Sequence, residues 1–234
     1  MSVRVDKFIC EALAVTRKQA TQLVKAGEVT LDGEVIKSGA LKIPTDSVLE
    51  YDGRMLSLSG PRYFMVNKPQ GVVCSHDDPV HATIFTLLDE IGAEKLHCAG
   101  RLDADTTGLV LLTDDGQWSH RITSPKHKCD KTYYVWTADP ISDTVAQEFA
   151  DGVQLRGEKT LTLPAVLEQT DKQEARLTIQ EGKYHQVKRM FAAVGNKVEG
   201  LHRESIGQLM LDENLEEGEY RALTPNEIAL FMRQ

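Results

Sequence analysis

The chain has 234 residues, of which 41% are hydrophobic, 26% charged and 6% aromatic, and its formal net charge is −8. This composition is ordinary for a globular protein and excludes a fibre or a disordered tail, and no run approaches the ~18 apolar residues of a membrane-spanning helix. The charged N-terminus lacks a signal-peptide core and the four cysteines form no CxxC pair, so we expect a cytoplasmic protein with neither a disulfide framework nor a metal site.

Basic residues are gathered in a few segments of an otherwise acidic chain. Residues 1–60 carry eight basic and eight acidic side chains, whereas residues 61–234 carry 19 basic and 27 acidic ones. Two stretches of the second part, residues 119–133 and 182–190, are nevertheless rich in lysine and arginine. Local patches of this kind bind phosphate even when the net charge is negative. Charge alone therefore leaves RNA binding and an ordinary mixture of solvated faces both open.

The first 58 residues are predicted to form a small separate module. Residues 5–13 have apolar side chains at helical spacing, and residues 16–27 begin with a capping box and end at a glycine, as a second helix does. Alternating apolar residues around Asp32-Gly33 predict a β-hairpin, and strand-like sequence follows over residues 48–58. We predict an αα-hairpin with a small sheet (residues 1–58), followed by a linker at residues 59–61.

The second domain, residues 62–234, mixes strands and helices. Short apolar or alternating runs predict strands, and apolar residues at helical spacing predict helices. The predicted strands are 63–67, 108–113, 132–137 and 175–179, and the predicted helices are 118–122, 145–149, 187–194 and a last one that begins at Thr224. Because strands and helices do not alternate strictly, an α+β fold with a mainly antiparallel mixed sheet and flanking helices is favoured over a doubly wound one.

The most distinctive segment is residues 100–113, which read GRLDADTTGLVLLT. It places Arg101 and Asp103 in a loop directly before a buried strand, and a loop carried on a rigid strand is where catalytic groups tend to lie. From residue types alone, Asp103 fits an ordinary surface carboxylate at least as well. The whole segment, however, resembles the signature of the pseudouridine synthases, in the branch that modifies ribosomal RNA and includes the RsuA type. The resemblance identifies Asp103, and not Asp105, as the indispensable catalytic residue.

Three further segments resemble the same family in the expected order. Residues 68–71 (KPQG) correspond to its KPxG turn, and residues 131–133 (KTY) to a strand whose tyrosine, here Tyr133, lies against the target base. Residues 182–190 (GKYHQVKRM) correspond to the final motif, in which a basic residue meets the catalytic aspartate; by position this is Lys188. The YHQVKRM form is nearer to the small-subunit RNA enzymes than to the arginine-rich form of many relatives.

The N-terminal module resembles the RNA-binding module of ribosomal protein S-four over about 45 residues, although a basic helical hairpin that serves only as a cap is the alternative. The residues expected to contact RNA are Lys7, Arg17, Lys18, Lys25, Arg101, Lys126, Lys128, Lys131, Lys183, His185 and Arg189.

The resemblance implies an RNA isomerase that converts one uridine of 16S ribosomal RNA to pseudouridine without a metal or cofactor. Asp103 would act at the ribose, Lys188 would favour its charged form, and Tyr133 would stack on the flipped base. We expect a monomer whose partner is 16S RNA or a partly assembled small subunit. The alternatives are a uridine of large-subunit RNA or tRNA as substrate, and a non-catalytic RNA-binding assembly factor.

Overall fold

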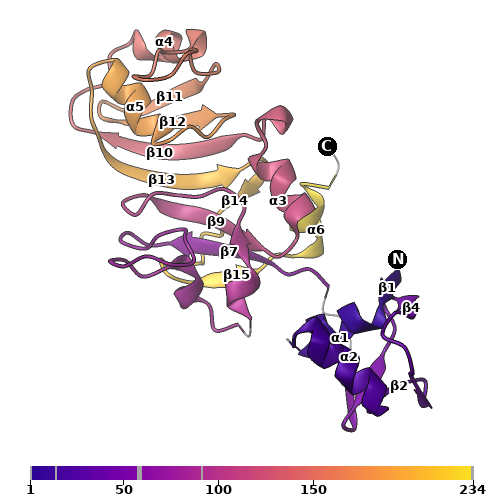
Figure 1. Ribbon diagram of the computed structural model, residues 1–234. Coiled ribbons are helices and arrows are strands. Elements are labelled where there is room, and N and C mark those ends of the chain that lie inside the picture. Colours follow the sequence, from indigo (N-terminus) through magenta and orange to yellow (C-terminus); the bar gives the residue numbers. More distant parts are fainter. Residues whose placement is uncertain (1, 14, 57–59, 91, 233–234) are drawn as a thin grey trace. The chain divides into compact units, whose positions relative to one another are not determined.

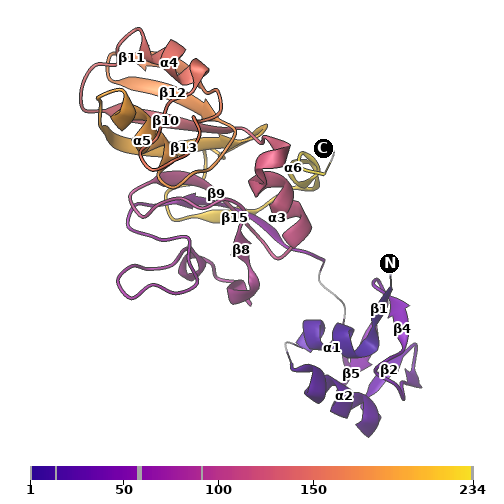
Figure 2. The ribbon, with the colours of Figure 1, turned by 45° about the horizontal axis from the view of Figure 1, so that its top comes forward.

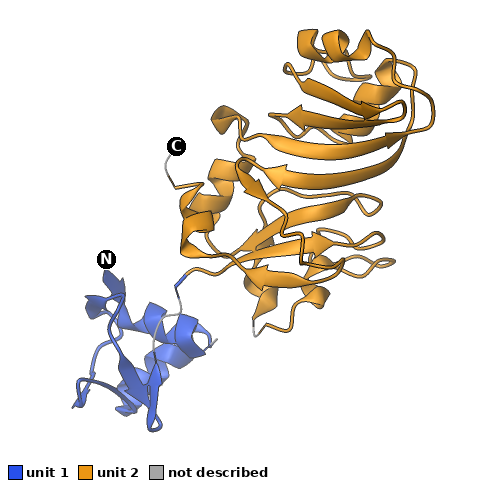
Figure 3. Cartoon of the chain, turned by 180° about the vertical axis from the view of Figure 1, so that it is seen from behind, with its two compact units in different colours: residues 1–60 blue, residues 61–234 orange. Residues whose placement is uncertain are grey.

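The chain forms two compact units, residues 1–60 and 61–234 (Figure 3). The computed structural model describes residues 2–13, 15–56, 60–90 and 92–232. Ser59 of the predicted linker lies outside the described residues, as do the last two positions of the strand-like segment that ends at Leu58. Each unit has a hydrophobic core built from its own side chains.

The first unit contains the two predicted helices, α1 (Val5–Leu13) and α2 (Arg17–Ala26), which follow a three-residue first strand. The capping box is confirmed, since the Thr16 hydroxyl accepts a hydrogen bond from the backbone N–H of Gln19, and Gly27 ends α2 in the left-handed conformation. The apolar faces of both helices pack on a small sheet and form one buried core. The predicted succession of two helices and a sheet is therefore present, after one short strand that precedes the helices.

Two small sheets complete the first unit. The sheet that follows the helices has the antiparallel order β3-β2-β5-β6, with the predicted hairpin as its β2–β3 pair. A second pair, β1 with β4, was not predicted, because three-residue strands leave no recognisable alternation. The strands are β1 (Ser2–Arg4), β2 (Val29–Leu31), β3 (Glu34–Val35), β4 (Lys42–Pro44), β5 (Leu49–Tyr51) and β6 (Arg54–Leu56).

The second unit is built on one mixed sheet with the order β11-β12-β10-β13-β9-β7-β15, to which β14 adds beside β13 and β8 beside β9 (Figures 1 and 2). Its described strand pairs are antiparallel except for β9 with β13, which confirms the predicted mainly antiparallel sheet. The strands are β7 (Tyr63–Lys68), β8 (His97–Cys98), β9 (Thr107–Thr113), β10 (Lys131–Thr137), β11 (Val166–Asp171), β12 (Glu174–Ile179), β13 (Val198–Ile206), β14 (Leu209–Met210) and β15 (Tyr220–Ala222).

Helices cover both faces of this sheet. Phe149 of α4 and Phe191 of α5 meet edge to face in one core, and Trp118 of α3 packs with Phe231 in the other. Alternate residues of β7 and β9 enter the two cores, which explains why β9 reads as a continuous apolar run. The helices are α3 (Gly116–Thr123), α4 (Val145–Asp151), α5 (Gln186–Ala193) and α6 (Pro225–Ala229), with short 3₁₀ turns η1 (Ile84–Leu87), η2 (Ala93–Lys95) and η3 (Pro125–His127).

The parallel contact between β9 and β13 joins the two halves of the sheet. It is short, pairing Thr107 with His202 and Gly108 with Arg203. Gly108 has a φ of 100°, and a Cβ atom there would lie 2.7 Å from the backbone nitrogen of Arg203 and closer still to its carbonyl oxygen. Only glycine fits this crossing, so the last glycine of the GRLDADTTG segment is required by packing.

Gly108→Ala is therefore expected to lower the free energy of unfolding by about 2–4 kcal/mol, from the backbone clash and the unfavourable φ together. Urea denaturation of the full chain measures the change. Gly116→Ala is the matched control: no atom lies within 4 Å of the Cβ position at this first residue of α3, so the substitution should be neutral or slightly stabilising. Equal stabilities for the two variants would contradict the argument.

Candidate active site

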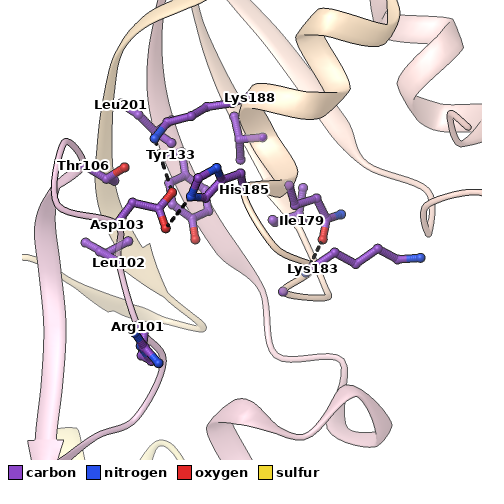
Figure 4. A pocket seen from close by; sticks show the side chains of 13 residues that line it. Arg101, Leu102, Asp103, Thr106, Tyr133, Ile179, Lys183, His185, Lys188 and Leu201 are labelled. Carbon is purple, nitrogen blue, oxygen red and sulfur yellow. Dashed lines mark hydrogen bonds and ion pairs between the residues drawn. The ribbon is translucent and has the colours of Figure 1, made fainter. Parts of the chain in front are cut away.

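The predicted catalytic residues meet at one pocket of about 100 Å³ in the second unit (Figure 4). The loop before β9 supplies Asp103, and β10 supplies Tyr133. His185 comes from the residue directly before α5, and Lys188 comes from the first turn of α5. Strands β9, β13 and β10 are neighbours in the sheet, so segments far apart in the sequence reach the same place. Among the described residues, no group of three or more His, Cys, Asp or Glu side chains is arranged to hold a metal ion.

Lys188 holds two carboxylates at the pocket. Its ammonium donates to Asp103 Oδ2 at 3.2 Å and to Asp105 Oδ1 at 2.6 Å. The sequence pointed to the first contact and missed the second. Burial acts to lower the pKa of Lys188, but the hydrogen bonds and charges of the two aspartates outweigh it and raise that pKa. Lys188 is therefore a cation throughout the neutral range and supplies one positive charge to two negative ones.

His185 approaches the other oxygen of the same carboxylate. Its Nε2 lies 3.4 Å from Asp103 Oδ1 (Figure 4). The imidazole also stacks on the ring of Tyr184, with centroids 3.8 Å apart. The backbone of His185 has a φ of 46°, in the left-handed region that is unfavourable for a residue with a Cβ. We expected His185 to contact RNA; the structure also places it against Asp103, within the site.

Tyr133 is held by an arginine that the sequence motifs did not indicate. Arg203 of β13 is buried and directs Nη1 to the Tyr133 hydroxyl at 3.5 Å, with its guanidinium 5.9 Å from the ring centroid. Its other bonds go to the carbonyl oxygens of Leu109, at 2.7 Å, and Gly100, at 2.9 Å. Arg203 thus ties the start of the Asp103 loop, β9 and Tyr133 together. Its only signal in the sequence is one basic residue within a strand-like run, which is too common to single out.

The KPQG turn supports the Asp103 loop from behind. The fully buried Lys68 ammonium donates to the carbonyl oxygens of Val72 at 2.7 Å, Pro69 at 2.8 Å and Ala104 at 3.4 Å. The backbone N–H of Gly71 also donates to Ala104, at 2.7 Å. Burial lowers the pKa of Lys68. The lysine of this motif therefore satisfies backbone carbonyls and fixes the loop that carries Asp103.

Comparison with known proteins gives the family. The model of the RNA pseudouridylate synthase family matches residues 62–193, more than half of the chain, and the S4 domain model matches residues 3–49. The chain belongs to the RNA pseudouridylate synthase family. The resemblance noted in the sequence is thereby confirmed for both the enzyme and its N-terminal RNA-binding module.

Two full-length relatives of this pseudouridine synthase have the same name. Ribosomal small subunit pseudouridine synthase A of Vibrio cholerae is 64% identical over 227 residues, covering 97% of this chain and 98% of that protein. The Escherichia coli K12 protein of the same name is 58% identical over 228 residues, covering 97% and 99%. A crystal structure of a pseudouridylate synthase superposes with a TM-score of 0.72 at 55% identity, covering 98% of this chain and 99% of that one.

The predicted RNA-binding residues of the synthase differ in their exposure and in their partners within the protein. The side chains of Lys7, Lys18, Lys25, Arg101, Lys126 and Lys128 are exposed. Arg17 is exposed as well, although its guanidinium bonds the buried carboxylate of Asp6. Lys183 is paired with Glu158 and Glu181.

Two of the predicted RNA contacts have their donors engaged inside the protein. Lys131 is buried, and its ammonium donates to the carbonyl oxygens of Cys129 at 2.7 Å and Ile122 at 3.3 Å. Arg189 donates to the carbonyl oxygens of Arg156 and Tyr184. Burial lowers the pKa of Lys131. In this structure the Nζ of Lys131 therefore faces the interior.

Lys188→Met is expected to lower kcat by about 100-fold, the size typical for loss of one electrostatic partner in an active site, with a much smaller effect on RNA affinity. The substitution leaves Asp103 and Asp105 facing one another without their shared cation. Single-turnover rates measured over a range of enzyme concentrations separate the two effects. Lys197→Met is the control, because that lysine pairs with Glu199 and does not line the pocket. An equal loss of rate in both variants would contradict the role of Lys188.

Proposed function

We propose that this enzyme converts one uridine of 16S ribosomal RNA to pseudouridine and that Asp103 is its catalytic residue. The assignment of 16S RNA as substrate rests on the small-subunit name shared by full-length relatives at 58–64% identity. Asp103 lines the pocket beside Tyr133 and has His185 Nε2 3.4 Å from its Oδ1, whereas Asp105 does not line the pocket, which supports the choice of Asp103 over Asp105. The intact site also disfavours a purely RNA-binding assembly factor.

The reaction is an isomerisation that needs no net oxidant or reductant. The bond from ribose C1′ to uracil N1 breaks, the base turns, and C1′ bonds to C5 of the ring, whose proton is lost while N1 gains one. An ionised Asp103 can start this sequence either by attacking the ribose carbon or by abstracting a sugar proton. Lys188, which donates to Asp103 Oδ2, holds this carboxylate in the pocket in either case.

The target uridine must leave its helix or loop to reach Asp103. Tyr133 lines the pocket and offers a ring on which the flipped base stacks, an interaction worth roughly 1–3 kcal/mol. Arg101, exposed at the mouth of the same pocket, is positioned to hold the displaced RNA. No step in this scheme requires a metal or a cofactor.

The proposed partner is 16S RNA, either free or in a partly assembled small subunit, and the enzyme acts as a monomer in the cytoplasm. The S4 domain at residues 3–49 supports an RNA partner. Within the described part of the chain, no helix is long and apolar enough to cross a membrane. Chemical mapping of pseudouridine in 16S, 23S and transfer RNA from cells with and without the gene tests the substrate: the loss of one 16S signal is expected, and the loss of a signal in 23S RNA or tRNA alone would overturn it.

Asp103→Asn is expected to abolish pseudouridine formation while RNA affinity and thermal stability stay near wild type. The amide has the same shape but neither attacks the ribose nor acts as a base. Product formation in purified 16S RNA is the measurement. Asp105→Asn is the matched control and should retain much of the activity, because Lys188 still bonds Asp103. Turnover above a few per cent in Asp103→Asn would contradict the assignment.

Removal of residues 1–58 is expected to leave a folded second unit with weaker RNA binding and slow residual turnover, since that unit has its own core and holds all the active-site residues. If Lys7, Arg17, Lys18 and Lys25 each meet a phosphate, the slope of log affinity against log salt should fall by about 3. Binding titrations at several salt concentrations measure both slopes. Identical slopes would show that the module does not bind RNA, and an insoluble product would contradict the expected independent folding of the second unit.

A further inference from the structure

A second hollow, of about 770 Å³, lies beside the active-site pocket. Tyr184 lines the hollow and its neighbour His185 lines the pocket, and their stacked rings, 3.8 Å between centroids and 20° between planes, separate the two. Arg156 and the small side chains of Ala192 and Ala193 form other parts of its lining. Only the Tyr184 ring therefore lies between the hollow and the His185 imidazole, which contacts Asp103. The volume of the hollow is within the ~300–1,000 Å³ typical of ligand sites.

The walls of the hollow are fixed by a network around Arg189. Its guanidinium donates to the carbonyl oxygens of Arg156 at 2.6 Å and Tyr184 at 2.9 Å and to Glu158 Oε1 at 3.2 Å. Lys183 lies 3.6 Å from the other oxygen of Glu158. The loop that carries Arg156 is thus tied to the loop that carries Tyr184. Because two cations face the single carboxylate of Glu158, the lining does not repel an anion.

The chemistry of the lining fits a nucleotide. Tyr184 is 75% exposed, an unusual state for a tyrosine with one ring face already stacked, and its other face is available to a base. Arg156 is exposed, and its side chain has no hydrogen bond or ion pair to another described residue. An aromatic face beside an arginine is the combination that binds single-stranded RNA, by stacking and by phosphate contact.

We propose that this hollow binds a nucleotide adjacent to the target uridine, with its base stacked on Tyr184 and its phosphate at Arg156. The inference rests on the proposed function only in taking the substrate to be RNA. When the target uridine enters the Asp103 pocket, a flanking nucleotide lies within one backbone step, and the Tyr184–His185 ring pair separates the two bases. The site would thereby select the sequence or conformation next to the modified position.

Equilibrium binding of a fluorescent single-stranded oligouridine to the full chain tests the site without requiring turnover. Tyr184→Ala should weaken binding about tenfold, the usual loss for one stacked base, whereas Tyr184→Phe should stay within about twofold because the ring remains. Arg156→Gln should weaken binding and reduce the salt slope by about 0.7. Lys172→Gln, which removes an exposed cation on the β11–β12 turn, is the control and should change the salt slope less. Unchanged affinity in both Tyr184→Ala and Arg156→Gln would overturn the proposal.

A second measurement separates base binding from mere support of His185. In a 16S fragment that contains the modified uridine, an abasic ribose at the flanking position should raise KM for the wild type and should add nothing further in Tyr184→Ala. A fall in kcat with unchanged KM and unchanged oligouridine affinity would show that Tyr184 only positions His185. If the wild type binds RNA but modifies no 16S fragment, the proposal that 16S RNA is the substrate is refuted. The oligouridine measurements still test whether the hollow binds a nucleotide.

Discussion

The guanidinium of Arg203 lies inside the sheet where its two halves meet, and the active site is assembled around it. A buried cation is costly unless its donors are satisfied, and here they reach two backbone carbonyls and a phenol oxygen. Each of those acceptors belongs to a different part of the site: β9, the start of the Asp103 loop, and Tyr133. The planar fork of arginine holds all three at once, which the single ammonium of a lysine does not. The close crossing at Gly108 brings the backbone of β13 near to β9, so that the Arg203 guanidinium reaches these three acceptors.

The same use of cations recurs at the buried Lys68 and Lys131 and at the half-buried Arg189. Each donates to backbone carbonyls in turns or loops around the site, where no strand or helix partner is available. An unpaired buried carbonyl costs about as much as a lost hydrogen bond, so a long basic side chain stabilises irregular backbone effectively. This explains why Lys131, which was expected to contact RNA, has its ammonium in the interior. In sequence, a lysine that reaches phosphate and one that caps a buried turn look alike.

Much of the fold was predictable because its signals are local. The Thr16–Gln19 capping box, the hairpin at Asp32-Gly33 and the apolar run of β9 each depend on neighbouring residues. The strand β13 was missed because its pairing with β10 has register shifts and its sequence mixes polar with apolar residues. Motif resemblance indicated Asp103, Tyr133 and Lys188, and these three side chains line one pocket. It gave no sign of the second carboxylate on Lys188, since that contact depends on how the loop turns in space.

The ring pair of Tyr184 and His185 connects recognition to catalysis. His185 keeps an unfavourable φ of 46°, and a conformation of this kind persists only where surrounding contacts hold it. Those contacts are the stacked Tyr184 ring on one side and the Asp103 carboxylate on the other. A base that stacks on the open face of Tyr184 would confine that ring and, through it, the imidazole beside Asp103 Oδ1. Binding free energy from a nucleotide that does not react would then be used to hold the reacting carboxylate in place, as remote contacts do in other enzymes. Selection of the correct RNA and orientation of Asp103 would follow from the same stacking contact.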